Sequence, residues 1–120
     1  MFSFNSKQNN VFFLLLSLVT LTGFGQEKHL KNIKQLTFGG DNAEAYFNPK
    51  GDKLTLQVTN KAFGVSCDQI FMLDLQAQEF NEKSLQLVST GKGRTTCSYY
   101  MPDGKHIIYA STHAADHACP

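Results

Sequence analysis

The sequence predicts an all-β protein built from a repeated unit of four antiparallel strands. Short apolar runs alternate with polar residues at period two, and no stretch after residue 25 has helical periodicity. One turn phrase also occurs twice, as YFNPKGDKLTL at Tyr46–Leu56 and as YYMPDGKHIIY at Tyr99–Tyr109. In each copy aromatic residues lead into a proline–glycine turn. Proline presets φ and glycine accepts a positive φ, so both phrases predict β-hairpins.

The first segment of the chain is predicted to be a signal peptide. The first ten residues carry one cation, Lys7, and the run Val11–Phe24 (VFFLLLSLVTLTGF) is almost wholly apolar. These 14 residues are too few to cross a bilayer core, which needs about 20. Gly23 and Gly25 are the small residues expected before a cleavage site, so we expect residues 1–25 to be removed. The alternative is a buried core helix.

Residues 26–120 are then expected to be exported, to the periplasm or outside the cell, with no membrane span after cleavage. Lys7 is one of 11 cations, so this mature part carries ten cations against ten anions. It contains no basic run and no basic patch with interleaved aromatic residues. Nucleic acid and anionic membranes are therefore not expected as partners.

Three cysteines, Cys67, Cys97 and Cys119, are disulfide candidates because an exported chain meets an oxidising compartment. Their number is odd, so one stays free or pairs outside this segment. Cys67 and Cys119 follow the two repeated prolines by 18 and 17 residues, which favours a structural use for both. Cys97 is a plausible partner for either, and the sequence does not select the pair.

The strands follow one another along the mature chain. Lys31–Thr37 (KNIKQLT) alternates and stops at a Phe-Gly-Gly break, and Lys53–Thr59 (KLTLQVT) alternates leucine and valine with threonine and glutamine. The same reasoning, with turn residues between the runs, predicts the remaining strands at residues 43–47, 68–75, 85–90, 95–100 and 106–111.

The two hairpin phrases belong to a longer repeat. Pro49 and Pro102 lie 53 residues apart, and the same offset places Tyr46 on Tyr99 and Leu54 on Ile107. Four strands lie between equivalent points, and a repeat of four antiparallel strands at this length is typical of a β-propeller blade. The alternative is a β-sandwich whose hairpins are alike by chance.

The order of the strands predicts how the ring would close. Lys31–Thr37 matches the fourth strand of a blade but comes first in the mature chain, as expected if it completes a blade made by the end of a longer chain. A propeller needs about four to eight blades, and this sequence supplies about one and a half. We therefore expect residues 26–120 to be the N-terminal part of a longer propeller domain rather than a stand-alone domain.

Two phrases, KQLTFGGDNAEAYFNPKGDKL and VSTGKGRTTCSYYMPDGKHIIYAST, resemble the repeats of TolB-like exported β-propellers of bacteria. Those repeats have leucine-threonine, a loop, aromatic-Ser-Pro-Asp-Gly-Lys, a hydrophobic strand and serine. Leu36-Thr37, Pro102–Lys105 and Ser111 fit this pattern. Asn48 and Met101 replace the usual serine, and Lys50 replaces the aspartate.

The resemblance implies a non-catalytic module without a cofactor, which binds protein or peptide in the cell envelope. Similar propellers also precede peptidase domains of the prolyl-oligopeptidase type, and some are polysaccharide lyases. The alternative function is therefore the propeller portion of a secreted hydrolase or lyase whose catalytic residues lie beyond residue 120. No Gly-x-Ser-x-Gly elbow occurs in the sequence, so no catalytic residue is predicted.

In a propeller, the loops that lead from fourth to first strand and from second to third strand share one face. The binding candidates that these loops supply are Asp41, Asn42, Glu44, Lys92, Arg94 and His113. Arg94 is singled out because its guanidinium fork can clamp a carboxylate, with a salt bridge between blades as the alternative. Solvated loop residues with purely structural roles are the alternative for the whole set.

The composition of His113-x3-His117-x-Cys119, with Asp116, is that of a metal site. Zinc sites need a defined geometry and usually four ligands, which a loop of unknown shape does not establish. No metal is therefore predicted, and an exposed loop with a disulfide cysteine is the expected interpretation.

Overall fold

The computed structural model describes residues 29–120, so the predicted signal peptide over residues 1–25 lies outside the described part. Lys34–Pro120 forms one compact unit. This unit contains six strands and two short 3-10 turns, in agreement with the predicted all-β class. No helix among the described residues is long and apolar enough to cross a membrane.

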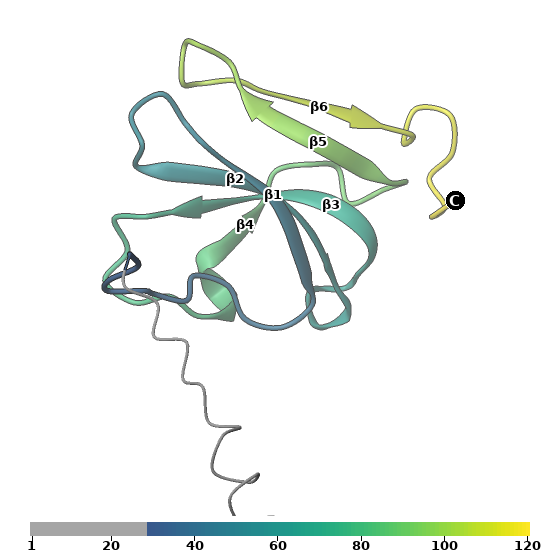
Figure 1. Cartoon of the computed structure of the whole chain (residues 1–120). Helices are drawn as coiled ribbons and strands as arrows, with labels where there is room; N and C mark the ends of the chain where they lie inside the picture. Colours follow the sequence, from purple (N-terminus) through teal and green to yellow (C-terminus); the bar gives the residue numbers. More distant parts are fainter. Residues whose placement is uncertain (1–28) are drawn as a thin grey trace, which may run out of the picture. The chain divides into compact units, whose positions relative to one another are not determined.

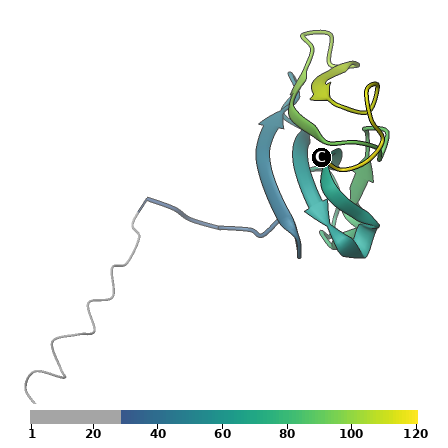
Figure 2. The same ribbon diagram turned by 90° about the vertical axis from the view of Figure 1, so that its right-hand side faces the viewer.

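The first four strands form one antiparallel sheet in the order β1-β2-β3-β4 (Figure 1). Their bounds are β1 (Asp41–Phe47), β2 (Lys53–Asn60), β3 (Val65–Asp74) and β4 (Leu85–Leu87). The turns are η1 (Lys61–Phe63) between β2 and β3, and η2 (Glu82–Ser84) before β4. Strands β5 (Thr95–Tyr100) and β6 (Ile107–Ser111) form a separate hairpin. This hairpin lies over one face of the four-stranded sheet (Figures 1 and 2).

Both predicted proline–glycine turns are present and have the same hydrogen bonds. The N–H of Gly51 donates to the carbonyl of Asn48, and that of Gly104 donates to the carbonyl of Met101, each at 2.9 Å. Gly51 and Gly104 have φ of 72° and 65°, values that favour glycine because it lacks a Cβ. The repeated sequence phrase therefore makes the same turn twice.

The 53-residue repeat extends to the strand register. In β1 and β2 the pairs are Asn42–Val58, Ala43–Gln57, Tyr46–Thr55 and Phe47–Leu54. Adding 53 to each number gives the four pairs of β5 and β6, which are Thr95–Ser111, Thr96–Ala110, Tyr99–Ile108 and Tyr100–Ile107. Each ladder is interrupted by a bulge at the same point, where Glu44 and its equivalent Cys97 have φ of 48° and 53°. The two hairpins are thus copies of one structure.

The hydrophobic core lies on one face of the four-stranded sheet. Leu54, Leu56 and Val58 point to this face because side chains alternate along a strand, and each is at most 7% exposed. The other buried members are Val65, Phe71 and Leu73, with Leu36, Phe63, Leu75, Phe80 and Leu85 packed against them. Burial of such apolar surface is the main favourable contribution to the stability of the sheet.

The opposite face of the sheet meets the β5–β6 hairpin through polar side chains. Thr55 and Ser98, both almost fully buried, are joined by a 2.6 Å hydrogen bond between their hydroxyl groups. The Thr96 hydroxyl donates to Oε1 of Gln57 at 2.6 Å. At the edge of this interface, the rings of Tyr46 and Tyr99 lie 5.5 Å apart. The two sheets therefore meet through directional hydrogen bonds as well as through buried apolar area, since Ile70 pairs with Gln57 on this face and is fully buried.

One predicted strand is wrong. Lys31–Thr37 contains no strand; Leu36 packs against the core, and the Gln35 side-chain amide donates to the carbonyl of Thr37 at 2.8 Å. Lys34 Nζ lies 4.2 Å from the centroid of the Phe80 ring. The segment is held by its side chains and has no strand partner in the described residues. The closure argument based on it has no structural support, and residues 29–120 contain no closed propeller.

Other boundaries also differ from the prediction, and β3 begins at Val65 instead of residue 68. β4 ends at Leu87 instead of Thr90, because the N–H groups of Val88 and Ser89 both turn to the carbonyl of Ile70. β1 begins at Asp41 instead of residue 43, so Asp41 and Asn42 lie on a strand instead of in a loop. Glu44 lies within the same strand, although it was counted among the loop candidates.

Candidate functional site

The candidate site is the loop end, which we define as the end of the unit formed by residues 39–42, 59–68, 88–94 and 112–120. Register brings these segments together. Asp41 pairs with Thr59, whose hydroxyl donates to Oδ1 of Asp68 at 2.6 Å. The N–H of Thr112 donates to the carbonyl of Arg94 at 3.0 Å, which attaches the segment after β6 to the β4–β5 loop.

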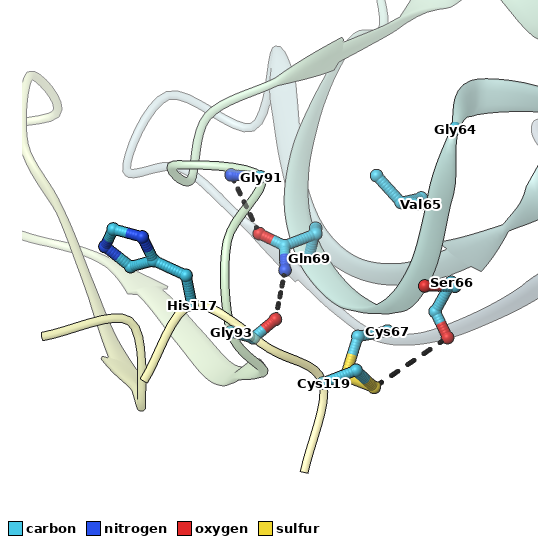
Figure 3. A pocket seen from close by; sticks show the side chains of 9 residues that line it. All are labelled: Gly64, Val65, Ser66, Cys67, Gln69, Gly91, Gly93, His117 and Cys119. Atoms are coloured by element: carbon cyan, nitrogen blue, oxygen red, sulfur yellow. Dashed lines mark hydrogen bonds between the residues drawn. A yellow bond between two sulfur atoms is a disulfide. The ribbon is translucent and has the colours of Figure 1, made fainter. Parts of the chain in front are cut away.

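Gln69 fixes the β4–β5 loop to β3. This side chain is 1% exposed, and its amide donates to the carbonyl of Gly93 at 2.8 Å. Its oxygen accepts from the Ser89 hydroxyl at 2.8 Å and from the N–H of Gly91 at 3.1 Å. Figure 3 shows Gln69 between the two glycines. A buried amide that is bonded at both its nitrogen and its oxygen stabilises one loop conformation.

Beyond Thr112, the segment after β6 is attached to the rest of the loop end at two further points. A disulfide joins Cys119 to Cys67 near the start of β3 (Figure 3). The N–H of Gly93 donates to the carbonyl of His117 at 2.9 Å. Between these contacts lies a polar pocket of about 70 Å³ with His117, Gln69 and the disulfide in its wall. The pocket is of a size for water rather than for an organic ligand.

Gly93 and its repeat equivalent Gly40 allow close approach of the backbone. A Cβ on Gly93 would lie 2.7 Å from the Thr112 hydroxyl and 2.8 Å from the nitrogen of His113. A Cβ on Gly40 would lie 2.5 Å from the carbonyl of Thr59 and 2.7 Å from Cβ of Asn60. Only glycine fits at either position, since its φ is also positive.

Arg94 contacts Asp68 across the two sheets. Its Nε lies 3.6 Å from Oδ2 of Asp68, and the two side chains are 49% and 29% exposed. Its Nη2 lies 4.0 Å from Sγ of Cys119. A half-exposed pair with a single contact contributes little to stability, because water and salt screen it. The guanidinium is therefore held over the loop end while much of it stays accessible.

Four of the other five predicted binding residues also lie at the loop end. Lys92 is exposed in the β4–β5 loop, and Asp41 and Asn42 are exposed at the start of β1. His113 is half-buried and its Nδ1 lies 2.7 Å from the Ser111 hydroxyl. The fifth, Glu44, lies further along β1, at the bulge, and is not part of this group.

The cysteines and histidines do not form a metal centre. Cys67 and Cys119 are joined, and Cys97 is a free, exposed thiol at the second bulge, so it pairs with neither. With Cys119 in a disulfide and His113 beside Ser111, the His113–Cys119 motif cannot act as a ligand set. Within residues 29–120, no group of three or more His, Cys, Asp or Glu side chains is placed to hold a metal ion.

The opposite end of the unit contains the groups with a shifted pKa. At the second turn, a hydrogen bond from His106 and the backbone N–H groups of Lys105 and His106 lower the pKa of Asp103 to about 2. Burial, and secondarily the charges of Asp52 and Asp74, raise the pKa of Tyr100 above its usual value. Its hydroxyl has no hydrogen-bond partner within the described chain. Neither group lies at the loop end.

Sequence reasoning missed Gln69, Ser89 and Gly93, which shape the loop end. In the predicted strand 68–75, Gln69 follows Asp68, so the strand begins with two polar residues. Polar residues at the start of a strand are equally typical of positions that face solvent. Gly93 could have been found from the sequence, because glycines follow both Thr37 and Thr90 at matching positions of the repeat. Such a repeated glycine indicates a place where the backbone is closely approached in both copies.

No protein-family model matches the chain, and comparison with curated proteins and with solved structures gives no match either.

Proposed function

We propose that the chain is an exported, non-catalytic module of the β-propeller type, TolB-like in its repeats, which binds protein or peptide in the cell envelope through its loop end. The observation that carries this proposal is the repeat of register, bulge and turn at a constant offset of 53 residues. A repeated antiparallel hairpin stacked on its copy is the arrangement from which propellers are built.

The loop end has the properties of a recognition surface. Its backbone is fixed by Gln69, by the disulfide and by the Gly93–His117 hydrogen bond, so little conformational entropy is lost when a ligand binds. Its charges are mixed, with Arg94 beside the half-buried Asp68 and with Lys92 and Asp41 exposed at the same end. Such a surface suits a peptide that presents both carboxylate and amine groups.

Arg94 is the proposed anchor of the peptide. Arginine binds carboxylates through two parallel N–H groups, and such charge-assisted hydrogen bonds are stronger than neutral ones. A ligand carboxylate would compete with Asp68 for the guanidinium, and the 3.6 Å separation of Arg94 and Asp68 makes their contact easy to displace. The export part of the proposal is supported by the Cys67–Cys119 disulfide, since disulfides persist in oxidising compartments.

The test is binding of a random peptide library with free C-terminal carboxylates, displayed on an array and probed with the full chain. Peptides that bind are then titrated while the backbone amide resonances are recorded by NMR. We expect shifts at residues 90–94 and 112–117, and none at the turns 48–51 and 101–104. Arg94→Ala should weaken binding about tenfold or more, which corresponds to the loss of one charge-assisted hydrogen bond.

Lys50→Ala is the matched control, because it also removes one exposed cation but at the opposite end. It should leave the affinity unchanged. Asp68→Asn should strengthen binding, since it frees the guanidinium. The proposal fails if no peptide binds, if Arg94→Ala binds as well as the wild type, or if the shifts map to the turns.

A further inference from the structure

We infer that the outer face of the β5–β6 hairpin docks on the open face of the β1–β2 hairpin of a second copy of this chain, in a head-to-tail contact. The outer face is defined by Ile108 and Ala110, and the open face by Ala43 and Ala45 with the hollow beside them. The inference uses the repeat within the structure and is independent of the proposed peptide-binding function. For these two faces it replaces the expectation that further blades of a longer chain cover them.

The contact between the two hairpins within one chain supplies the geometry. Thr55 and Gln57 of the first hairpin are covered by Ser98 and Thr96 of the second. The repeat equivalents of Thr55 and Gln57 are Ile108 and Ala110. Thr55 is fully buried, whereas Ile108 is 58% exposed. The second hairpin therefore presents the same side that the first hairpin buries, and nothing within the described residues covers it.

The complementary surface is present on the first hairpin. Within one chain, Thr96 and Ser98 are the residues through which the second hairpin contacts the first. Their repeat equivalents in the first hairpin are Ala43 and Ala45. Both alanines are exposed. They line a hollow of about 310 Å³ whose wall also includes Leu36, Leu54 and Leu56, with Thr37, Asn42 and Glu44 as its polar members. The first hairpin is related to the second by one rotation and translation. A second copy of the chain that is placed by repeating this movement would bring its own hollow over Ile108.

Compared with the contact within the chain, the residues on both surfaces of the proposed contact change from polar to apolar. This matched change favours their pairing. Within the chain, the contact uses two polar pairs, Thr55 with Ser98 and Gln57 with Thr96. In the head-to-tail contact, the equivalent pairs are Ile108 with Ala45 and Ala110 with Ala43. Both polar pairs are replaced by apolar pairs, so these two pairs would leave no hydroxyl or amide without a partner. The exposed side chain of Tyr99, beside Ile108, adds apolar area to the same face.

The second copy is favoured as occupant because one chain carries both halves of the contact. The two faces are different surfaces, so the contact is heterologous, and a dimer keeps one free face of each kind. Assembly by this contact would continue to open oligomers or close into a ring, instead of stopping at a symmetric dimer.

The test uses the full chain produced under oxidising conditions, studied by sedimentation over a range of concentrations, with non-reducing gels to exclude disulfide-linked dimers through Cys97. We expect concentration-dependent oligomers for the wild type. Ile108→Glu and Ala45→Glu each place a charge at an exposed position of one face. Each should raise the dissociation constant about 100-fold or more, because burial of an unpaired charge is strongly unfavourable. Gln86→Glu adds the same charge at an exposed position on β4 and should have no effect.

Mixing the two variants gives the decisive result. Ile108→Glu retains a wild-type open face, and Ala45→Glu retains a wild-type outer face. An equimolar mixture should therefore form a 1:1 dimer that does not grow, with an affinity within about threefold of the wild-type contact. This recovery also shows that both variants are folded.

Three results would overturn the inference. The first is a wild-type chain that stays monomeric throughout the concentration range. The second is dissociation by Ile108→Glu but not by Ala45→Glu, which would indicate a symmetric contact between two outer faces. The third is a mixture that contains only monomers although each variant keeps the wild-type circular dichroism spectrum.

Discussion

At the scale of single residues, Asp103 shows how one substitution makes the two copies of the turn different. Its repeat equivalent is Lys50, and Asn48 instead supplies the acceptor in the first turn, where its Oδ1 accepts from the N–H groups of Asp52 and Lys53, each at 3.0 Å. In the second turn, Asp103 accepts from the N–H groups of Lys105 and His106. The same turn is thus stabilised by a neutral acceptor once and by a charged acceptor once.

This difference predicts a specific acid sensitivity. The pKa of Asp103 is lowered from 3.8 to about 2, so its ionised form favours the folded state. Its stabilisation is present above pH 3.8 and is lost as the pH falls to about 2. We expect Asp103→Asn to reduce the loss of stability over this interval, measured as the free energy of unfolding in urea at several pH values. Glu79→Gln, at an exposed position, is the control; an equal reduction by both variants would contradict the assignment to Asp103.

Also at this scale, residue type and environment explain which site residues were predictable. Arg94, Lys92 and Asp41 were selected as charged residues at loop positions, and the structure places all three at the loop end. Gln69 was not selected, because its burial depends on the β4–β5 loop that folds over it. A glutamine on a strand is equally compatible with solvent until the loop is in place.

At the scale of elements, a glycine precedes the first strand of each hairpin, Gly40 before β1 and Gly93 before β5. Each glycine allows the chain before the strand to pack closely against the end of the second strand of the same hairpin or the segment that follows it. Gly93→Ala would bring a Cβ within 3.0 Å of the carbonyl of Asp116 and closer still to Thr112 and His113. These backbone atoms belong to the segment after β6, which is fixed by the disulfide and by hydrogen bonds, so they cannot move away without a loss of stability. We expect a loss of about 2–4 kcal/mol in the free energy of unfolding, measured by urea denaturation, from the clash together with an unfavourable φ.

Gly51→Ala separates these two causes. Gly51 has a φ of 72°, but a Cβ there would meet nothing within 4 Å. Only the backbone strain applies, and the expected loss is about 1–2 kcal/mol. Equal losses in the two variants would show that the close approach at Gly93 contributes nothing.

The elements that the sequence predicted correctly are those with a turn on each side. The strands at residues 53–59 and 95–100 were predicted because alternation and turn chemistry agree there, and β2 and β5 have nearly these bounds. Lys31–Thr37 alternates equally well, but a strand also needs a neighbour with free N–H and carbonyl groups. Periodicity indicates which side chains share a face of a strand, but it does not supply the neighbour. Leu36 is packed on the core, whereas Ile33, the other apolar residue of the segment, is 78% exposed.

At the scale of the whole molecule, the disulfide ties the second hairpin to the first sheet. Cys67 and Cys119 are 52 residues apart, and a loop of this length restricts the unfolded chain considerably. In the chain-entropy view, its closure contributes about 4 kcal/mol. We expect Cys119→Ser to lower the free energy of unfolding by about 3–4 kcal/mol, measured in urea without reductant.

Cys97→Ser is the matched control, because it removes a thiol that is exposed and free. It should change the free energy of unfolding by less than about 0.5 kcal/mol. If Cys119→Ser were as stable as Cys97→Ser, the disulfide would not constrain the unfolded chain, and the loop end would be held by its hydrogen bonds, among them those of Gln69, His117 and Thr112.

The polar character of the contact between the two sheets has a consequence for temperature dependence. Exposure of apolar surface raises the heat capacity on unfolding, whereas exposure of polar surface lowers it. Separation of Thr55 from Ser98 and of Gln57 from Thr96 exposes mainly hydroxyl and amide groups. These two polar pairs therefore add little to the heat-capacity change of unfolding, whereas the buried Ile70 and Tyr100 add to it. The contribution of the two pairs to stability should consequently vary less between cold and warm conditions than that of the leucine-rich core on the other face of the sheet.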